Sequence, residues 1–478
     1  MANVINAYLS ERLAHYFEEI SAIPRASYHE QGIADYLEAF AASRGLFCYR
    51  DEASNVLIKK QGTAGREQEA PLLLQAHTDM VTEVAFGTTH DFMTEGVVLK
   101  RADNILSADG TTLGADDGFG VAMMLAVLDG AAASHPPLEC LFTSAEEVGL
   151  IGAGAFDYSR IAARRMLNFD SAEEHLVITG CCGGVRSDLK LPVTNEPCEA
   201  VGLCIGVHGL CGGHSGEDIH RGRANAFLTA GTLLHGLREQ VEFRVVSING
   251  GDKDNAIPRD CEVVILPADL QAAKSYFADA EGLIAKLVTC ADDKNRSLSV
   301  QEVQVSSVLT EKDTENLLDL LCVPNGVLRY RTDIIGMPET SRNLASFRTK
   351  EQEIAVRFSS RSPFEATLDS LMAELDALAA KLGGKTVHSS RYPGWEGTPD
   401  SALSSGWQQT YRRLTGREIS TTVIHAGLEC GLISSKLPGL EVISVGCNIH
   451  DLHTPVETME LDSFERVYQT FLAFLEIC

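Results

Sequence analysis

The stretch LLLQAHTD, residues 72–79, is an apolar run of strand length that ends in polar side chains. Side chains alternate between the two faces of a strand, so His77 and Asp79 project to the same side where this strand ends. A carboxylate in that position can hold an imidazole in one tautomer while the other ring nitrogen binds a metal. Taken alone, the segment is explained as well by a histidine and an aspartate in a solvated loop.

Similar apolar runs alternate with helical segments around this stretch. Runs of strand length lie at residues 56–58, 138–142 and 166–169, and a helical segment covers residues 121–128. Short buried strands that alternate with helices predict a mainly parallel sheet with helices on its faces. Such sheets carry their chemistry at the carboxyl ends of the strands. We therefore expect an α/β catalytic domain whose site lies at that edge.

The pattern changes after residue 184. Polar and apolar residues alternate over 186–191, and helices over about 225–237 and 368–382 accompany strands such as 243–248. This texture is typical of an antiparallel sheet with helices on one side. Turn residues cluster near 389–395, after which a helix and a strand return to the first texture. With 478 residues, more than one core is expected. The predicted organisation is a catalytic domain over residues 1–185 and 389–478 with an inserted α+β domain over residues 186–388.

Charge and composition exclude several classes of partner. Forty Lys and Arg against 66 Asp and Glu give a net charge of −26, which would repel nucleic acid and anionic lipid. The longest apolar stretch, residues 121–128, is far shorter than the roughly 20 residues of a membrane-spanning helix. The N-terminal stretch has apolar residues at helical spacing and no export signal, and the 13 cysteines form no CxxC pair. We therefore expect a cytoplasmic protein with reduced thiols that binds neither nucleic acid nor membrane.

Further acidic and histidine residues follow predicted strands or precede a predicted helix. Each segment alone is explained by an ordinary turn, a helix start or a solvated loop. Two adjacent carboxylates such as Glu146 and Glu147 could divide the work, with one binding a metal and the other accepting a proton. Together the segments offer nitrogen and oxygen ligands without sulfur, enough for two metals if one carboxylate bridges them. This set comprises His77, Asp116, Glu147, Asp170 and His453.

These segments and others resemble a known family, the co-catalytic dizinc metallopeptidases that include carnosinases, aminoacylases and glutamate carboxypeptidases. The resemblance runs in order through almost the whole chain, on Ile23-Pro24, Ser27-Tyr28-His29-Glu30, QAHTDM, TTLGADDG, EEVG, GGHSG, NAIPR, ETSRN, HAGLECG and HTP. It implies a catalytic domain with an inserted ferredoxin-like lid and dimerisation domain. It also implies a homodimer with two Zn²⁺ per subunit, for which Mn²⁺ or Co²⁺ are possible substitutes.

The resemblance assigns the ligands to two metal positions. It implies that His77 and Asp170 bind one zinc, that Glu147 and His453 bind the other, and that Asp116 bridges the two. His450 is a second candidate ligand, and His453 is preferred because the family motif is histidine followed by Ser or Thr and then Pro.

The resemblance also implies the catalytic residues. Glu146 becomes the general base, which later returns the proton to the leaving amine, and Asp79 becomes the residue that orients His77. A cis peptide bond is implied between Asp116 and Asp117. Close relatives often have asparagine where this sequence has Asp117. The extra negative charge would change the metal affinity, so the resemblance does not fix that affinity.

The resemblance points to four residues around the substrate. His214, in the GGHSG segment, would reach the scissile carbonyl, often from the partner subunit. Asn255, Arg361 and Glu429 could hold the termini of a small peptide, and Arg361 offers a bidentate fork for a carboxylate. The alternatives are a surface loop around His214 and ordinary turns or ion pairs for the other three.

The function implied is zinc-dependent hydrolysis of unblocked dipeptides, among them Xaa-His and carnosine-like peptides, by metal-activated water with Glu146 as base. Removal of acyl groups from amino acids and trimming of longer peptides are alternatives within the same chemistry. A third alternative is an inactive relative that only binds peptides. The presence of all five ligands and Glu146 argues against it, because clustered like-charged groups are costly to keep without a function. Ligand type alone does not decide among Zn, Mn and Co.

Overall fold

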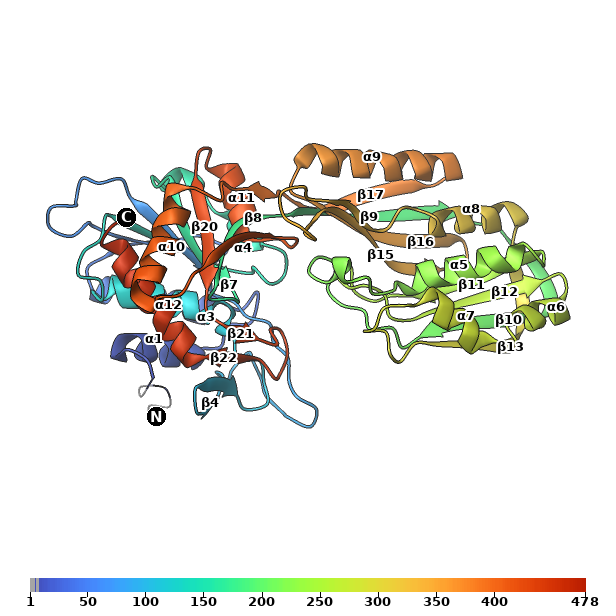
Figure 1. The fold of residues 1–478 in the computed structure, drawn as a ribbon, viewed down its shortest axis with the longest axis horizontal. Helices are drawn as coiled ribbons and strands as arrows, with labels where there is room; N and C mark the ends of the chain where they lie inside the picture. The colour runs from blue at the N-terminus through green and yellow to red at the C-terminus, as the bar shows by residue number, and fades with distance from the viewer. Residues whose placement is uncertain (1–4, 6–7) are drawn as a thin grey trace. The chain divides into compact units, whose positions relative to one another are not determined.

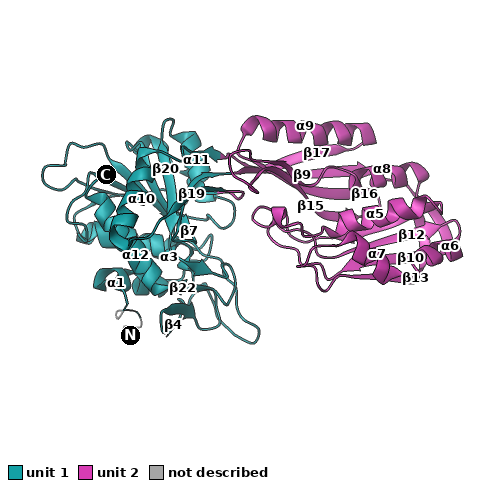
Figure 2. Cartoon of the chain, in the orientation of Figure 1, with its two compact units in different colours: residues 1–181, 395–423, 428–478 teal, residues 182–394, 424–427 magenta. Residues whose placement is uncertain are grey.

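A mixed β-sheet forms the centre of the first of two units into which the chain divides (Figures 1 and 2). The computed structural model describes residue 5 and residues 8–478. The first unit consists of residues 1–181, 395–423 and 428–478, and the second of residues 182–394 and 424–427. Both ends of the chain thus build the first unit, and the second is inserted between them, which confirms the predicted α/β class with an inserted domain.

The bounds of the elements follow the two units. The first unit contains α1 (Glu11–Ser21), α2 (Gln31–Ser43), β1 (Phe47–Arg50), β2 (Val56–Lys60), β3 (Leu72–His77), β4 (Leu99–Ala102), β5 (Ile105–Ala108), α3 (Ala115–Leu128), β6 (Leu138–Thr143), α4 (Ile151–Ala155), β7 (Arg165–Ser171), β8 (Leu176–Cys181), β18 (Trp395–Glu396), α10 (Ala402–Thr415), β19 (Ser420–Ile424), α11 (Glu429–Lys436), β20 (Glu441–Gly446), β21 (Ile449–His450), β22 (Thr458–Glu460) and α12 (Leu461–Leu475). The second contains β9 (Gly183–Pro192), β10 (Asn195–His208), α5 (Ala226–Arg238), β11 (Phe243–Gly250), β12 (Cys261–Pro267), α6 (Leu270–Tyr276), α7 (Ala280–Leu287), β13 (Ser297–Leu309), α8 (Glu311–Leu321), β14 (Gly326–Tyr330), β15 (Pro338–Thr349), β16 (Glu353–Ser362), α9 (Glu365–Leu382) and β17 (Lys385–Tyr392). Short 3₁₀ turns lie at Tyr158–Arg160 and Ile219–Arg221.

The centre of the first sheet is parallel and its edges are antiparallel. Its strand order is β1-β2-β6-β3-β7-β20-β8-β18, with β19 paired to β8. β6, β3, β7 and β20 run parallel, and α3 lies in the connection between β3 and β6. β1 and β2 are antiparallel because the connection over residues 51–55 is too short for a crossover. The predicted parallel sheet is confirmed at the centre, where its carboxyl ends form one edge.

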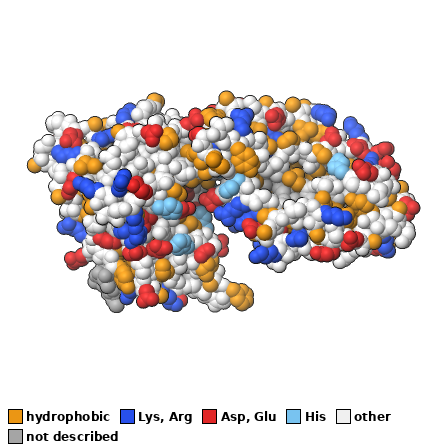
Figure 3. Space-filling model, viewed as in Figure 1, with side chains coloured by type: hydrophobic (Ala, Val, Ile, Leu, Met, Phe, Trp, Pro, Cys, Tyr) orange, Lys and Arg blue, Asp and Glu red, His pale blue; other side chains and the backbone are white. Residues whose placement is uncertain are grey.

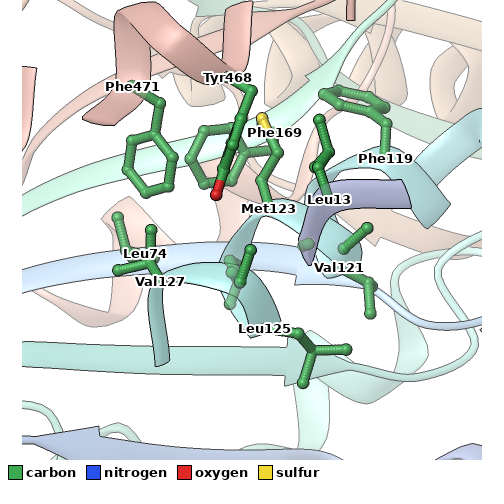
Figure 4. Close-up of a cluster of buried hydrophobic side chains, with 14 of the residues drawn as sticks. Leu13, Leu74, Phe119, Val121, Met123, Leu125, Val127, Phe169, Tyr468 and Phe471 are labelled. Atoms are coloured by element: carbon green, nitrogen blue, oxygen red, sulfur yellow. The ribbon is translucent and has the colours of Figure 1, made fainter. Parts of the chain in front are cut away.

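Helix α3 fills the space between the sheet and two outer helices. Leu74 of β3 and Phe169 of β7 belong to the same buried cluster as Met123 of α3 (Figure 4). Leu13 of α1 and Phe471 of α12 belong to this cluster as well (Figure 4). Residues 117–128 of α3 are all buried, which is typical of a helix surrounded by protein on every side. This packing fixes the N-terminus of α3 at the edge of the sheet.

A smaller antiparallel sheet joins residues 99–108 to residues 449–460. Its strand order is β21-β22-β5-β4, and Thr458 at the start of β22 pairs with Ser107 near the end of β5. The loop over residues 451–457, which precedes β22, therefore lies beside the loop over residues 109–114, which follows β5. Segments more than 300 positions apart in the sequence thus meet next to the start of α3.

The second unit is an antiparallel sheet whose helices share one core. Its strand order is β13-β10-β12-β11-β15-β16-β9-β17, with β14 paired to β15. Ile205 of β10 and Phe358 of β16 belong to one buried cluster with Leu234 of α5, Leu317 of α8 and Leu375 of α9. The predicted α+β arrangement is therefore confirmed.

The unit borders differ from the predicted domain borders by a few residues. The sequence predicts domain borders after residues 185 and 388, whereas the borders between the units lie after residues 181 and 394. The difference arises because β9 already begins at Gly183 and β17 extends to Tyr392. Residues 424–427 group with the second unit, which no composition shift indicates.

Two sequence expectations concern membranes and cysteines. Among the described residues, no helix is long and apolar enough to cross a bilayer. The structure places none of the 13 cysteines in a disulfide bond, and Cys211 and Cys322 are the exposed ones among the described residues.

Candidate active site

The five predicted ligands lie together at the carboxyl edge of the first sheet. His77 ends β3, Glu147 follows β6 and Asp170 lies near the end of β7. Asp116 lies in the first turn of α3, and His453 lies in the loop between β21 and β22. Figure 3 shows histidine side chains beside acidic side chains on the first unit. We call the set of His77, Asp116, Glu146, Glu147, Asp170 and His453 the ligand cluster.

Overlapping groups within the cluster could each hold a metal ion. Within each group, the potential ligand atoms all lie within 4.8 Å of one another. The groups are His77 with Asp116 and Asp170, Asp116 with Glu147 and His453, and His77 with Glu146 and Glu147. His77, Asp116 and Glu147 each belong to two of these groups, so the possible metal positions share ligands.

The two carboxylate oxygens of Asp116 face different histidines. Its Oδ1 lies 2.9 Å from Nε2 of His77, and its Oδ2 lies 3.3 Å from Nε2 of His453. One carboxylate can therefore contribute an oxygen to each side of the cluster.

The chemistry of the donors fits a pair of divalent cations. Oε1 of Glu147 lies 3.2 Å from Nε2 of His453, yet it has no hydrogen-bond partner of proper geometry among the described residues. A buried carboxylate oxygen without a donor is costly unless a cation satisfies it. Imidazole nitrogen and carboxylate oxygen are common ligands of Zn²⁺ and are also accepted by Mn²⁺ and Co²⁺.

Burial and mutual repulsion dominate the electrostatics of the cluster. Burial raises the pKa of Glu146, Glu147 and Asp170, and neighbouring carboxylates raise it further. Burial also opposes ionisation of Asp116, but hydrogen bonds from His453 and His77 outweigh it and hold the pKa of Asp116 well below its usual range. Burial would lower the pKa of His453, yet its close contacts with the carboxylates of Asp116 and Glu147 raise that pKa to about 11. The carboxylates of the cluster therefore stabilise the protonated, positively charged form of His453.

Asp79 connects His77 to the turn that follows β6. Its Oδ1 lies 3.4 Å from Nδ1 of His77. Its carboxylate also accepts the backbone N–H groups of Glu146 at 3.0 Å and Glu147 at 3.2 Å, and the hydroxyl of Ser27 at 2.7 Å. The sequence predicts only the contact with His77. No sequence motif predicts the contacts of Asp79 with the backbone of residues 146 and 147.

Asp117 supports the cluster from outside it. The Asp116–Asp117 peptide bond is cis, as the family resemblance implies. The carboxylate of Asp117 accepts the backbone N–H groups of His77 at 3.1 Å and Gly120 at 3.2 Å. Asp117 therefore connects β3 to the first turn of α3.

The structure distinguishes the two candidate histidines in the 449–455 segment. Nε2 of His450 lies 3.1 Å from a carboxylate oxygen of Glu460, and His450 is in none of the potential metal groups of the described residues. His453 faces Asp116 and Glu147 instead.

Glu429 lies beneath the cluster rather than at its surface. It is completely buried and accepts a hydrogen bond from Oγ1 of Thr143 at 2.7 Å and one from Nε2 of Gln75. Asn168 donates in turn to Gln75 at 2.6 Å. Burial raises the pKa of Glu429 to about 7. A direct contact between Glu429 and a peptide terminus stays a prediction.

The other three predicted substrate residues lie together in the second unit. Nη2 of Arg361 is 3.5 Å from Nε2 of His214, and Nη1 of Arg361 donates to the hydroxyl of Tyr392 at 2.9 Å. The backbone N–H of Ser215, next to His214, donates to the carbonyl of Asn255 at 2.7 Å. This brings the GGHSG and NAIPR segments side by side. Nε of Arg361 is buried and finds no hydrogen-bond partner in the described part of the chain.

Sequence reasoning missed two buried charged residues at the edge of the cluster, Arg25 and Glu457. Each follows a segment used for the resemblance, Ile23-Pro24 and HTP, so a charged residue beside a motif is the signal that could have found them.

Comparisons with known proteins identify two family matches and several similar chains. Residues 55–178 match Peptidase family M28, and residues 205–297 match the Peptidase dimerisation domain. The cytosol non-specific dipeptidase of Escherichia coli (strain K12) is 34% identical over 94% of this chain and 93% of its own length. The crystal structure of aminoacylhistidine dipeptidase from Vibrio alginolyticus has a TM-score of 0.84 at 32% identity, over 98% of this chain and 97% of that one.

More distant structures share the fold alone. A tripeptidase from Staphylococcus aureus has a TM-score of 0.57 at 17% identity, over 98% of this chain and 99% of that one. With a 34% identical relative matched almost from end to end, the chain belongs to the metallopeptidase family of the cytosol non-specific dipeptidase and is an enzyme of the peptidase class.

Proposed function

We propose that this protein hydrolyses unblocked dipeptides, among them Xaa-His dipeptides, in a reaction that depends on two divalent cations in the ligand cluster. The observation that carries the proposal is the position of Asp116, whose two oxygens face His77 and His453 on opposite sides. That arrangement suits a bridging carboxylate, and a pair of metal ions is a common device for hydrolysing amides.

The proposed ligands divide into two sets. His77 and Asp170 hold one cation, Glu147 and His453 hold the other, and Asp116 bridges them. We propose Zn²⁺ as the metal, with Mn²⁺ and Co²⁺ as substitutes. Such a pair of ions would lower the pKa of water and polarise the peptide carbonyl.

Glu146 is the proposed general base. It accepts a proton from the attacking water and returns it to the leaving amine. Burial and the neighbouring carboxylates raise the pKa of Glu146, which favours a group able to take up a proton and release it again. Asp79 accepts the backbone N–H of Glu146 and so fixes the turn from which this side chain extends.

The second unit supplies three of the four proposed substrate contacts, and Glu429 belongs to the first unit. His214 stabilises the oxyanion of the tetrahedral intermediate, and Arg361 binds the substrate carboxylate. The unpaired Nε of Arg361 supports this role, because a carboxylate would give that buried donor a partner. Asn255 and Glu429 are the remaining candidates for binding the peptide termini.

We propose that the protein is a cytoplasmic homodimer. The match of residues 205–297 to the Peptidase dimerisation domain supports the dimer, and the name of the Escherichia coli relative supports the compartment. Each dimer then holds two active sites.

Removing the metals should abolish hydrolysis and restoring them should recover it. Chelator-treated protein is tested on a dipeptide panel and on N-acetyl amino acids, before and after reconstitution with Zn²⁺, Mn²⁺ or Co²⁺. We expect metal-dependent cleavage of dipeptides and much slower cleavage of the N-acetyl compounds. Preferential cleavage of N-acetyl amino acids would identify an acylase, and full activity of the metal-free protein would contradict the proposal.

Glu146→Gln should retain the metals and lose turnover, because the amide has nearly the same shape but cannot accept the proton. The expected loss in kcat is about 10²–10⁴-fold. Glu139→Gln is the matched control, since Glu139 is a buried carboxylate at the opposite end of β6. Near-normal turnover of Glu146→Gln with full metal occupancy would remove Glu146 from its role.

Asp116→Ala and His453→Ala should differ in metal content. Loss of the bridging carboxylate should weaken both metal positions, whereas loss of His453 should empty mainly one. His450→Ala is the control in the same loop and should keep both metals. The measurement is metal per subunit after gel filtration, and two retained ions in Asp116→Ala would contradict the bridging role.

Mixed dimers should reveal whether His214 serves the partner's site. Glu146→Gln and His214→Ala change different units, so a mixed dimer would contain one site with both residues intact. Mixing the two inactive proteins should restore up to roughly one quarter of wild-type activity, because half of the dimers are mixed and each has one complete site. Glu146→Gln mixed with Asp116→Ala should restore none, since both changes affect the same unit. No recovery in the first mixture despite subunit exchange would exclude a role across the dimer.

A further inference from the structure

The loop over residues 113–115, which ends at the first residue of α3, leads into Asp116 and is held from two sides by buried charged side chains. The loop connects the β5 region to α3, and its last residue directly precedes Asp116. Arg25 is 2% exposed and Glu457 is 3% exposed. Neither residue has a ligand or base role in the proposed reaction.

Glu457 binds the N–H groups of the loop. Its Oε2 accepts from Leu113 at 2.9 Å and Gly114 at 3.1 Å, and its Oε1 accepts from Ala115 at 2.9 Å. Three consecutive N–H groups that converge on one carboxylate form an anion-binding nest. Both carboxylate oxygens accept hydrogen bonds from the loop, which fixes the orientation of the loop relative to Glu457.

Arg25 binds the carbonyl groups on the other side. It donates to the carbonyl oxygen of Gly114, and also to those of Thr78 at 3.1 Å and Asp79 at 3.2 Å. One guanidinium therefore connects the segment that follows β3 with the loop that precedes α3. The first of these contains Asp79, and the second leads into Asp116.

Gly114 shows how closely the loop is held. Its φ angle is +67°, and a Cβ atom there would lie 2.5 Å from Nη2 of Arg25 and 2.8 Å from Sδ of Met80. A side chain at this position would therefore displace Arg25 as well as strain the backbone.

The charge of Arg25 also suits its surroundings. Burial lowers the pKa of Arg25, and the carboxylates of Glu457, Asp79, Asp117 and Asp116 oppose this shift. A guanidinium stays protonated in proteins, so Arg25 is a cation next to carboxylates that repel one another.

We infer that Arg25 and Glu457 are positioning residues that fix the 113–115 loop, and through it the bridging carboxylate Asp116, so that both metals are held tightly. This inference rests on the metal site proposed above. Neither side chain needs to touch the substrate or a metal. Loss of either should loosen Asp116 and weaken both metal positions together.

Glu457→Gln tests the inference at the N–H side of the loop. The amide keeps one accepting oxygen, so at least one of the three N–H groups would face an NH₂ group and the charge would be lost. Removal of a group that orients a metal ligand typically weakens metal affinity about 10–100-fold. We expect a weakening of that size at both positions, measured by competition with a chromophoric chelator.

The chain offers a matched control for this substitution. Glu139 is 4% exposed and accepts the backbone N–H groups of Ala162 and Ala163, both at 2.9 Å, and a hydrogen bond from Lys59. The same kind of contact is thus present at the far end of β6. Glu139→Gln should lower the melting temperature without changing metal affinity.

Arg25→Lys tests the carbonyl side and serves if Glu457→Gln does not fold. Lysine keeps the charge but lacks the fork that reaches both segments. Arg66→Lys is its control, because Arg66 donates to the backbone oxygens of Leu475 and Cys478 and to the carboxylate of Glu69, away from the cluster. We expect weaker metal binding in Arg25→Lys and wild-type metal binding in Arg66→Lys. The circular dichroism spectra of both metal-loaded proteins should match that of the wild type.

Three outcomes separate the inference from simple destabilisation and from the proposed function. Wild-type metal affinity in both Glu457→Gln and Arg25→Lys would overturn the inference. Equal weakening in the Glu139 and Arg66 controls would also overturn it, because the effect would then follow general stability. A wild-type protein that binds no divalent cation would overturn the proposed function itself, and the inference with it.

Discussion

Repulsion between carboxylates that are buried side by side is the constraint around which the first unit is organised. Asp116, Glu146, Glu147 and Asp170 lie within one small region, and burial makes their shared negative charge costly. The protein opposes that cost with nearby positive groups, which are His77, His453 and Arg25. Backbone N–H groups directed at the supporting carboxylates Asp79 and Asp117 add to this. A pair of divalent cations would complete the compensation, which is why the proposed metals and the fold are closely linked.

The sheet separates this charge from the apolar core by the alternation of its strands. Leu74 and Phe169 face α3, whereas Gln75 and Asn168, each one position away on its own strand, are joined by a hydrogen bond on the opposite face. Residues two positions further along that polar face, His77 and Asp170, are proposed metal ligands. A one-residue shift of either strand would exchange the polar and apolar faces, so the packing against α3 also fixes the register of the ligands.

Much of this arrangement is predictable from the sequence, because it depends on local patterns. Apolar runs that end in acidic residues or histidine predict the central strands and the positions of His77 and Asp170. The antiparallel edges and the grouping of residues 424–427 with the second unit depend on pairing between distant segments, which periodicity does not encode. Arg25 and Glu457 are missed for a related reason. A single buried charged residue forms no repeating pattern in the sequence. Its partners are backbone groups of a loop far away in the sequence.

The order in which the chain is synthesised has a consequence for the site. Strand β20 lies between β7 and β8 in the sheet, yet residues 441–446 are synthesised only after the main part of the second unit, residues 182–394. His453 and Glu457 emerge later still, after the entire second unit. A nascent or truncated chain that ends before residue 457 therefore contains Asp116 without the carboxylate that holds its loop. If the chain ends before residue 441, it also lacks β20 in the sheet. Completion of the proposed metal site is thus delayed until residues 453 and 457 have been synthesised, after the whole second unit.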